Sequence, residues 1–189
     1  MKKKITAFTL VLFILTLALC FQSASAQYNS STNPASVGET VKSMIELGSV
    51  YSNIYDISIT VIETVRGKNA MDLLKKADRK NSKPPKGYEY ILVRARFEMK
   101  GRAVTDTLSF NVGDNPLQWV ALASDLTDYP KASVTVPKPA LMGTVKSGDS
   151  LEGWAAFMVD QKDTSPVMVF DPDSGGATGR GRTLFFKLY

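Results

Sequence analysis

The stretch Tyr88-Glu-Tyr-Ile-Leu-Val-Arg-Ala-Arg-Phe-Glu-Met99 decides the fold class, because apolar and polar residues alternate along most of it. One side carries Ile91, Val93, Ala95, Phe97 and Met99, and the other carries Tyr90, Arg94, Arg96 and Glu98. A period of two is typical of a strand with one face on a core and one face in water, as in antiparallel sheets. The stretch Tyr55-Asp-Ile-Ser-Ile-Thr-Val61 alternates in the same way. Both are therefore predicted to be strands.

Several shorter stretches on the C-terminal side have the same character. They are Thr105–Val112, Gln118–Ala123, Ser150–Val159, Pro166–Phe170 and Arg182–Tyr189, and clusters of Gly, Pro, Asp and Asn separate them. About seven short strands joined by such turns are typical of a two-sheet sandwich. We predict an all-β fold, an immunoglobulin-like antiparallel β-sandwich, over residues 37–189.

One short helix is predicted to interrupt the strands. Ala70-Met-Asp-Leu-Leu-Lys-Lys-Ala-Asp-Arg-Lys80 is rich in helix formers, and Met71, Leu74 and Ala77 share one face. Asn69 is a suitable N-cap, with Asp72 expected in the first turn, where the helix dipole favours an acid. The run Asn81-Ser-Lys-Pro-Pro-Lys-Gly87 would end the helix, because proline cannot continue it.

The first 26 residues have the pattern of a secretory signal peptide. Three lysines precede the apolar run Ile5–Phe21, and Ala24-Ser-Ala26 follows it, which predicts cleavage after Ala26. An uncleaved anchor is the first alternative, although the apolar run is short for a bilayer span. Lipidation at Cys20 is the second, although Leu19 stands where a lipoprotein signal has a small residue. Residues 27–36 are polar and are predicted to form a flexible leader. The protein is expected to be secreted, extracellular or associated with the cell wall.

Composition excludes several kinds of chemistry. The 189 residues include no His and one Cys, so Ser-His-Asp and Cys-His catalysis, zinc fingers and an internal disulfide are excluded. The predicted signal carries three lysines, the single cysteine and no acid. The remaining 163 residues therefore hold 20 basic and 18 acidic groups, a net charge of +2. A domain of this size can bury a sufficient core without cross-links.

Charge is unevenly distributed along the chain. Residues 66–102 contain 12 basic and 4 acidic residues, and the predicted helix and its exit loop carry Lys75, Lys76, Arg79, Lys80, Lys83 and Lys86. An anionic partner, such as a wall polymer, lipid headgroups or an acidic protein surface, would suit this patch. The simpler alternative is a solvated helix face, which is the more common case. Nucleic acid is not expected, because no helix-turn-helix or aromatic RNA-binding motif is present.

Other motifs are weaker. Asp171-Pro-Asp-Ser-Gly-Gly176 could ligate calcium, but it lacks the full EF-hand spacing and fits a turn better. The glycine-rich run 175–181 follows no strand–helix unit, so we expect no phosphate loop and no cofactor. Trp119 and Trp154 could stack on sugars, although tryptophans on sandwich strands more often pack in the core. No particular pair among the acids is selected as catalytic.

The chain resembles a known family in three groups of residues. They are the stretch from Arg66-Gly-Lys-Asn-Ala70 through Pro84-Pro85 and Gly87-Tyr-Glu-Tyr90 to Ile91–Arg96, the opening Val37–Val41, and the late run Ser147–Trp154. The family is the telokin-like, immunoglobulin-fold domain of unknown function in secreted proteins and lipoproteins of Gram-positive bacteria, related to a secreted mycobacterial immunoprotective antigen. The resemblance implies the sandwich and a cell-envelope setting, and it supplies no catalytic residues.

These observations favour an exported, non-enzymatic interaction module with an anionic wall polymer or another envelope protein as its partner. Contact with a membrane is expected only through the signal segment or through lipidation at Cys20. The alternative from another class is a secreted hydrolase that cleaves wall or extracellular glycans with two carboxylates. A third is an assembly role in which an exposed sheet edge pairs with a partner strand.

Overall fold

The structure is a computed structural model that describes residues 28–48, 52–102, 108–173 and 179–189. The predicted signal peptide, the cleavage point after Ala26 and Cys20 lie outside these residues. The described strands are β1 (Thr40–Leu47), β2 (Asn53–Arg66), β3 (Tyr88–Gly101), β4 (Ser109–Val112), β5 (Trp119–Leu122), β6 (Gly143–Lys146), β7 (Ser150–Asp160), β8 (Val167–Phe170), β9 (Gly179–Gly181) and β10 (Leu184–Lys187). The described helix is α2 (Gly67–Ala77). The fold is mostly β with one short helix, as predicted.

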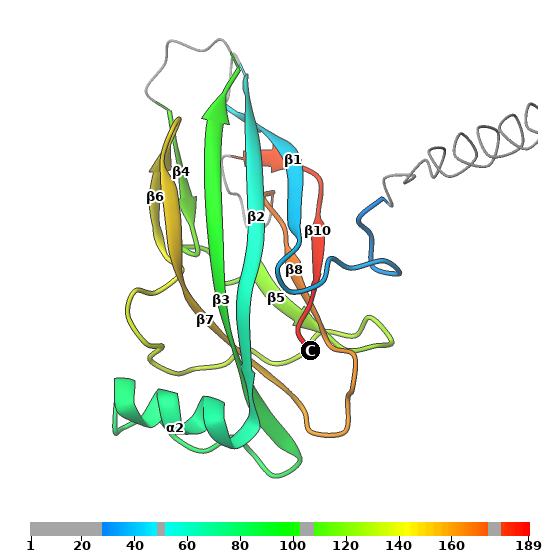
Figure 1. The fold of residues 1–189 in the computed structure, drawn as a ribbon, viewed down its shortest axis with the longest axis vertical. Coiled ribbons are helices and arrows are strands. Elements are labelled where there is room, and N and C mark those ends of the chain that lie inside the picture. Colours follow the sequence, from blue (N-terminus) through cyan, green and yellow to red (C-terminus); the bar gives the residue numbers. More distant parts are fainter. Residues whose placement is uncertain (1–27, 49–51, 103–107, 174–178) are drawn as a thin grey trace, which may run out of the picture.

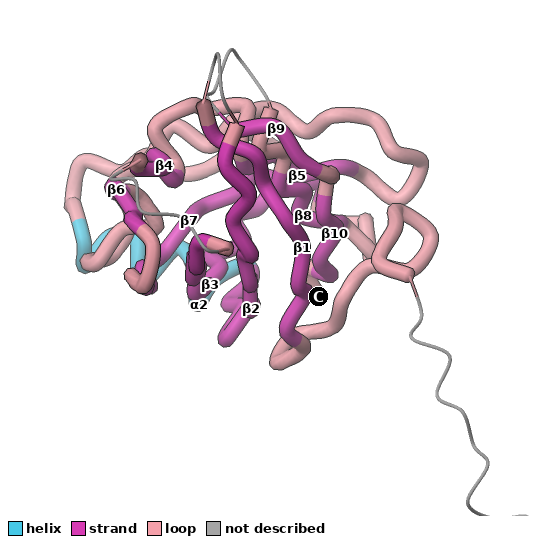
Figure 2. The backbone as a smooth tube through the Cα atoms, turned by 90° about the horizontal axis from the view of Figure 1, so that it is seen from above, coloured by secondary structure: helices cyan, strands magenta, loops and turns pink. Residues whose placement is uncertain are grey.

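The strands form antiparallel sheets (Figure 1). A five-stranded sheet has the order β7-β3-β2-β1-β9, a three-stranded sheet has the order β10-β8-β5, and β4 pairs with β6. The long strands β2 and β3 run most of the length of the molecule and carry α2 at one end (Figure 1). The sheets curve around a common interior when seen from above (Figure 2).

The core lies between these sheets. The alternation predicted for β2 and β3 is confirmed, because Ile57, Ile59 and Phe97 are buried on the inner face of the large sheet. Phe97 contacts Phe110 of β4 and Phe170 of β8, with ring centroids 5.7 Å and 5.8 Å apart. Each fully buried side chain of this size contributes roughly 1.5–3 kcal/mol through removal of apolar surface from water. Aromatic residues from all three sheets therefore close one core.

A second, smaller core lies on the outer face of the large sheet, beneath α2. Tyr90 and Leu92 are 5% and 0% exposed there, packed with Ala70 and Leu74 of the helix. The prediction that Tyr90 faces water was wrong, because the helix covers that part of the sheet. Both faces of β3 are buried at this end, which breaks the alternation that the sequence shows further along the strand.

The helix begins and ends earlier than predicted. Arg66 occupies the N-cap position without a side-chain cap bond, and Asn69 lies inside the helix. Asp72 lies beyond the first turn and pairs with Lys68, with 2.6 Å between carboxylate and ammonium. Ala77, predicted to share the buried face, is exposed.

Three strands were not individually predicted. β1 has no strict alternation, β6 is four residues long, and β9 lies in the glycine-rich run. Residues 28–36, predicted to be a flexible leader, lie against β10 in the structure. Ala35 donates to the Phe185 carbonyl at 2.9 Å and is 3% exposed. The Asn29 side chain donates a hydrogen bond to the Phe185 carbonyl and accepts one from the Phe185 amide.

Candidate functional site

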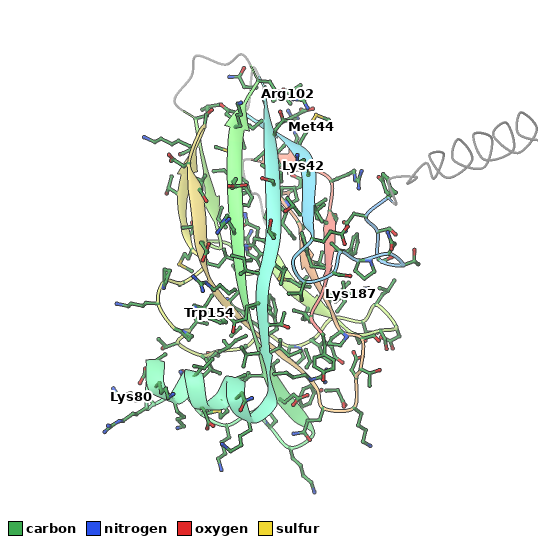
Figure 3. The ribbon with its side chains drawn as sticks, viewed as in Figure 1. Lys42, Met44, Lys80, Arg102, Trp154 and Lys187 are labelled. Atoms are coloured by element: carbon green, nitrogen blue, oxygen red, sulfur yellow. The ribbon has the colours of Figure 1, made fainter. Side chains whose placement is uncertain are left out.

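The predicted basic residues lie on the helix and on the loop that leaves it. Lys75, Lys76, Arg79, Lys80, Lys83 and Lys86 are all exposed, and we call them the helix patch. Lys75 and Lys76 occupy the last turn of α2, where a positive charge complements the helix dipole. Lys75 also donates to the Arg79 carbonyl at 3.0 Å. Lys80 points away from the protein at this end of the molecule (Figure 3).

The helix patch differs from the arginines of the same basic block. Arg66 pairs with Glu89 at 2.5 Å, and Arg94 and Arg96 both pair with Glu152. Among the described residues, no carboxylate pairs with a helix-patch side chain. Arg94 and Arg96 share one carboxylate, and Lys100 of β3 has no carboxylate within ion-pair distance among the described residues. The helix patch therefore carries most of the unpaired charge of the block.

Pairing with two arginines also fixes the ionisation of Glu152. The hydrogen bond from Arg96, followed by the nearby charge of Arg94, lowers the pKa of the Glu152 carboxyl. Glu152 therefore stays a carboxylate and holds the guanidinium groups on the outer face of β3 and β7. A carboxyl in this state suits an ion pair and does not suit a general acid, which needs a raised pKa.

The structure also has a groove that the sequence did not reveal. It has a volume of about 1460 Å³ and lies on the outer face of the large sheet, at the end opposite α2. Its lining comes from all five strands of that sheet or the turns beside them, including Lys42 and Met44 of β1, Asp56 of β2, Lys100 of β3, Ser150 of β7 and Arg180 of β9. We call it the sheet groove.

Strand register places the groove side chains in rows across the sheet. Lys42 lies opposite Ser58, which lies opposite Glu98. In the next row Met44 lies opposite Asp56, which lies opposite Lys100. Alternate residues of a strand share a face, so these rows form one continuous surface.

Two acids in the groove are already neutralised. Arg102 binds Asp56 at 2.6 Å, and its hydrogen bonds lower the pKa of the Asp56 carboxyl. Arg180 lies 3.5 Å from Glu46. Glu98, Asp149 and Asp173 also line the groove, so its described lining holds five acids and five cations.

Three groove cations have no acidic partner within ion-pair distance among the described residues: Lys42, Lys100 and Arg182. Beside them, Met44 is 48% exposed and Ile54 is 40% exposed. Figure 3 shows Lys42, Met44 and Arg102 at one end of the molecule and Lys80 at the other. Arg182 donates to the Asn29 carbonyl and lies over the Tyr28 ring. The groove therefore places charged groups of both signs beside two exposed apolar side chains, away from the helix patch.

The described residues hold no group of three or more potential metal ligands, and none of their helices could cross a membrane. Asp171 and Asp173 form a local turn, with the Asp173 amide donating to the Asp171 carboxylate. Residues 174–176 of the candidate calcium loop lie outside the described residues. Trp119 packs on Phe170 at 4.6 Å, and Trp154 packs in the small core. Both tryptophans thus contribute to packing.

No protein-family model and no curated protein matches the chain. Two solved structures from Bacillus subtilis are similar to it. The yjhA protein aligns with a TM-score of 0.48 and 15% identity, over 82% of this chain and 99% of its own. The ycdA protein, provisionally named a lipoprotein, aligns with a TM-score of 0.45 and 16% identity, over 69% of this chain. This chain spans 36% of the ycdA protein.

The sequence located the helix patch but not the sheet groove. The patch can be found from the sequence because its residues lie close together along the chain. The groove joins β9 to β1 and β2 to β3, so its residues are brought together only by strand pairing. In the sequence, the groove was indicated only by the predicted water-facing positions of Asp56, Ser58 and Glu98.

Proposed function

We propose that this protein is an exported, non-enzymatic interaction module that binds an anionic partner through the helix patch. The observation that carries the proposal is the contrast in charge pairing. Arg66 and Arg102 each pair with a carboxylate, and Arg94 and Arg96 share that of Glu152. The helix patch is exposed and has no such pair among the described residues. An anionic wall polymer or an acidic envelope protein has the complementary chemistry.

Retention on immobilised wall polymer or heparin tests this proposal. Replacing Lys75, Lys76, Arg79 and Lys80 together by Gln should reduce retention, and retention of the unaltered protein should fall steeply with salt. The matched control replaces Lys131, Lys138, Lys146 and Lys162 by Gln, four exposed lysines outside the patch. Equal losses in both variants would mean that net charge alone acts, and would contradict a specific patch.

We also propose export from the cell and an immunoglobulin-like sandwich of the telokin-like family. The signal-peptide pattern supports export, and the common core enclosed by antiparallel sheets supports the sandwich. Mass spectrometry of protein from the medium should find Gln27 at the N-terminus, whereas recovery in membranes with Met1 retained would contradict cleavage. An experimental structure with the same sheet orders tests the fold.

The alternative of a carboxylate-based glycan hydrolase stays a prediction that no specific contact favours. Two acids of the large sheet, Glu152 and the groove residue Asp56, have lowered pKa values because arginines bind them. Two-carboxylate hydrolysis needs one carboxylic acid that keeps its proton near neutral pH.

A further inference from the structure

The helix patch is drawn out along one end of the molecule. The exit loop begins beside the last turn of α2, where the Asn81 side chain donates to the Leu74 carbonyl at 2.8 Å. The chain then returns to the start of the helix, because the N-cap residue Arg66 pairs with Ile91 of β3. An 11-residue helix is about 16 Å long, so the loop runs beside α2 over about that distance (Figure 1).

The cations are spread along this path. Four of the six lie at the end of the helix, and Lys80 points away from the protein there (Figure 3). The other two, Lys83 and Lys86, lie on the returning loop. Gly87 follows Lys86 and accepts a hydrogen bond from the Gln161 amide at 3.0 Å, which holds this end of the loop against the turn after β7. The helix patch is therefore an elongated row and not a compact cluster.

The acids around the helix patch are bound elsewhere. Residues 67–87 hold seven basic and two acidic residues, a net charge of +5. Asp72 pairs with Lys68, which lies outside the patch, and the Asp78 carboxylate accepts the Lys80 amide at 2.8 Å. The acids at the end of β7 and in the turn after it accept amides of that turn. Among the described residues, none of these four acids forms an ion pair with the helix patch.

The helix patch offers no apolar anchor to a partner. None of the large apolar side chains that are exposed in the described residues lies between positions 67 and 87, and the apolar face of α2 packs in the small core. Protein interfaces are enriched in aromatic residues, Met and Arg and depleted in Lys, whereas five of the six patch cations are Lys. A helix that lies in a bilayer surface inserts an exposed apolar face. An acidic protein and a lipid surface therefore fit the helix patch poorly.

We propose that the helix patch binds a linear polyanion of repeated phosphate groups, which lies along the row. This inference rests on the proposed function of the patch and names its class of ligand. A lysine ammonium is a compact point charge with three rotating donors, so successive lysines can each contact a phosphate without a fixed orientation. Carboxylates in this protein are paired mainly with arginine, which supplies the cation in five of the six ion pairs among the described residues. A phosphate chain matches both the elongated layout and the lysine composition.

Fluorescence anisotropy of labelled long-chain polyphosphate, measured at several salt concentrations, tests the inference. The protein should bind the long chain about tenfold more tightly than tripolyphosphate, because the short chain covers only part of the row. Affinity should fall steeply with salt, since each contact releases counterions. Polyglutamate of matched charge, which represents an acidic protein segment, should bind about tenfold more weakly than polyphosphate. Vesicles of phosphatidylcholine with phosphatidylglycerol should not retain the protein.

Variants at the two ends of the row separate its length from its charge. K83Q/K86Q should weaken binding of the long chain about tenfold and reduce the salt slope by up to about two, one for each lost contact. The same variant should leave tripolyphosphate binding unchanged, because four cations remain at the helix end. K75Q/K76Q should weaken binding of both anions. Circular dichroism checks that each variant is folded.

The matched control is K42Q/K100Q, which removes two exposed lysines of the sheet groove and should change neither affinity. Losses no larger than in this control would overturn both the inference and the proposed function, as would a protein that binds none of the anions. A long chain that binds no more tightly than tripolyphosphate would overturn the inference alone. Equally tight binding of polyglutamate would assign the patch to acidic proteins, and retention on the vesicles would assign it to a lipid surface. Either result overturns the inference and leaves an anion-binding patch in place.

Discussion

Asn81 and Thr135 join through a pair of reciprocal hydrogen bonds between the exit of α2 and a distant loop. The Asn81 Nδ2 donates to the Thr135 carbonyl at 2.8 Å, and the Thr135 amide donates to Asn81 Oδ1 at 2.7 Å. The same Nδ2 also donates to the Leu74 carbonyl at 2.8 Å. Asn81 is 5% exposed, so one buried amide fixes both the helix end and the segment that packs beside the small core.

Asn81→Ala should therefore destabilise the protein strongly. The change removes three hydrogen bonds, two of which join Asn81 to the Thr135 backbone, while the Leu74 carbonyl keeps its bond from the Asp78 amide. Loss of three hydrogen bonds costs about 2–4 kcal/mol. Urea unfolding followed by tryptophan fluorescence measures the loss. The control is Ser82→Ala, which alters an exposed neighbour. Equal stability of the two variants would show that Asn81 does not hold these segments together.

This relationship also shows where prediction from sequence stops. Helix-forming residues and the prolines Pro84 and Pro85 were sufficient to predict a helix and its exit. The partner of Asn81 lies 54 residues away, and nothing local marks it. In the same way, alternation identified the outward side of β2 and β3, but the groove needs β9, a strand of three residues whose pairing with β1 depends on the tertiary fold.

Gly153→Ala should also destabilise the fold. A Cβ at Gly153 would lie 2.3 Å from the Ala140 carbonyl and 2.5 Å from the Leu141 amide nitrogen, so rigid backbone would have to move. Overpacking of this kind costs typically 1–3 kcal/mol. Gly143→Ala is the matched control, because its Cβ would approach a Leu151 methyl carbon at 3.4 Å, an ordinary contact. Thermal unfolding should rank the two variants in that order, and the reverse ranking would contradict the close approach of these segments.

Tyr129 should ionise later than an ordinary tyrosine as pH rises. Burial, followed by the hydrogen bond that its hydroxyl donates to Asp163 at 2.7 Å, raises its pKa to about 12. Because the folded pKa exceeds the unfolded value of 10.0, the stabilisation is complete below pH 10 and is lost as pH rises toward 12. Ultraviolet titration should show a late phenolate that is absent in Tyr129→Phe. A titration in which Tyr129→Phe removes an ordinary phenolate would contradict the contact.

The contribution of Glu152 to stability should be lost at low pH, whereas that of Tyr129 is lost at high pH. Because the hydrogen bond from Arg96 lowers its folded pKa, its contribution to stability is present above the ordinary carboxyl range and is lost as pH falls through the lowered value. Carboxyl carbon shifts in nuclear magnetic resonance report this titration directly. Arg96→Gln should move the Glu152 midpoint upward, whereas Arg180→Gln, at a different ion pair, should leave it in place.

Leu126→Gly should make the protein more stable. Glycine adopts positive φ without the steric cost that leucine bears at 68°, which is roughly 1–2 kcal/mol. Some of that gain is offset because glycine loses more backbone entropy on folding, so the free energy of unfolding should rise by about 1 kcal/mol or less. Urea unfolding measures the change. A free energy of unfolding that falls in Leu126→Gly would contradict the steric cost of leucine in this conformation.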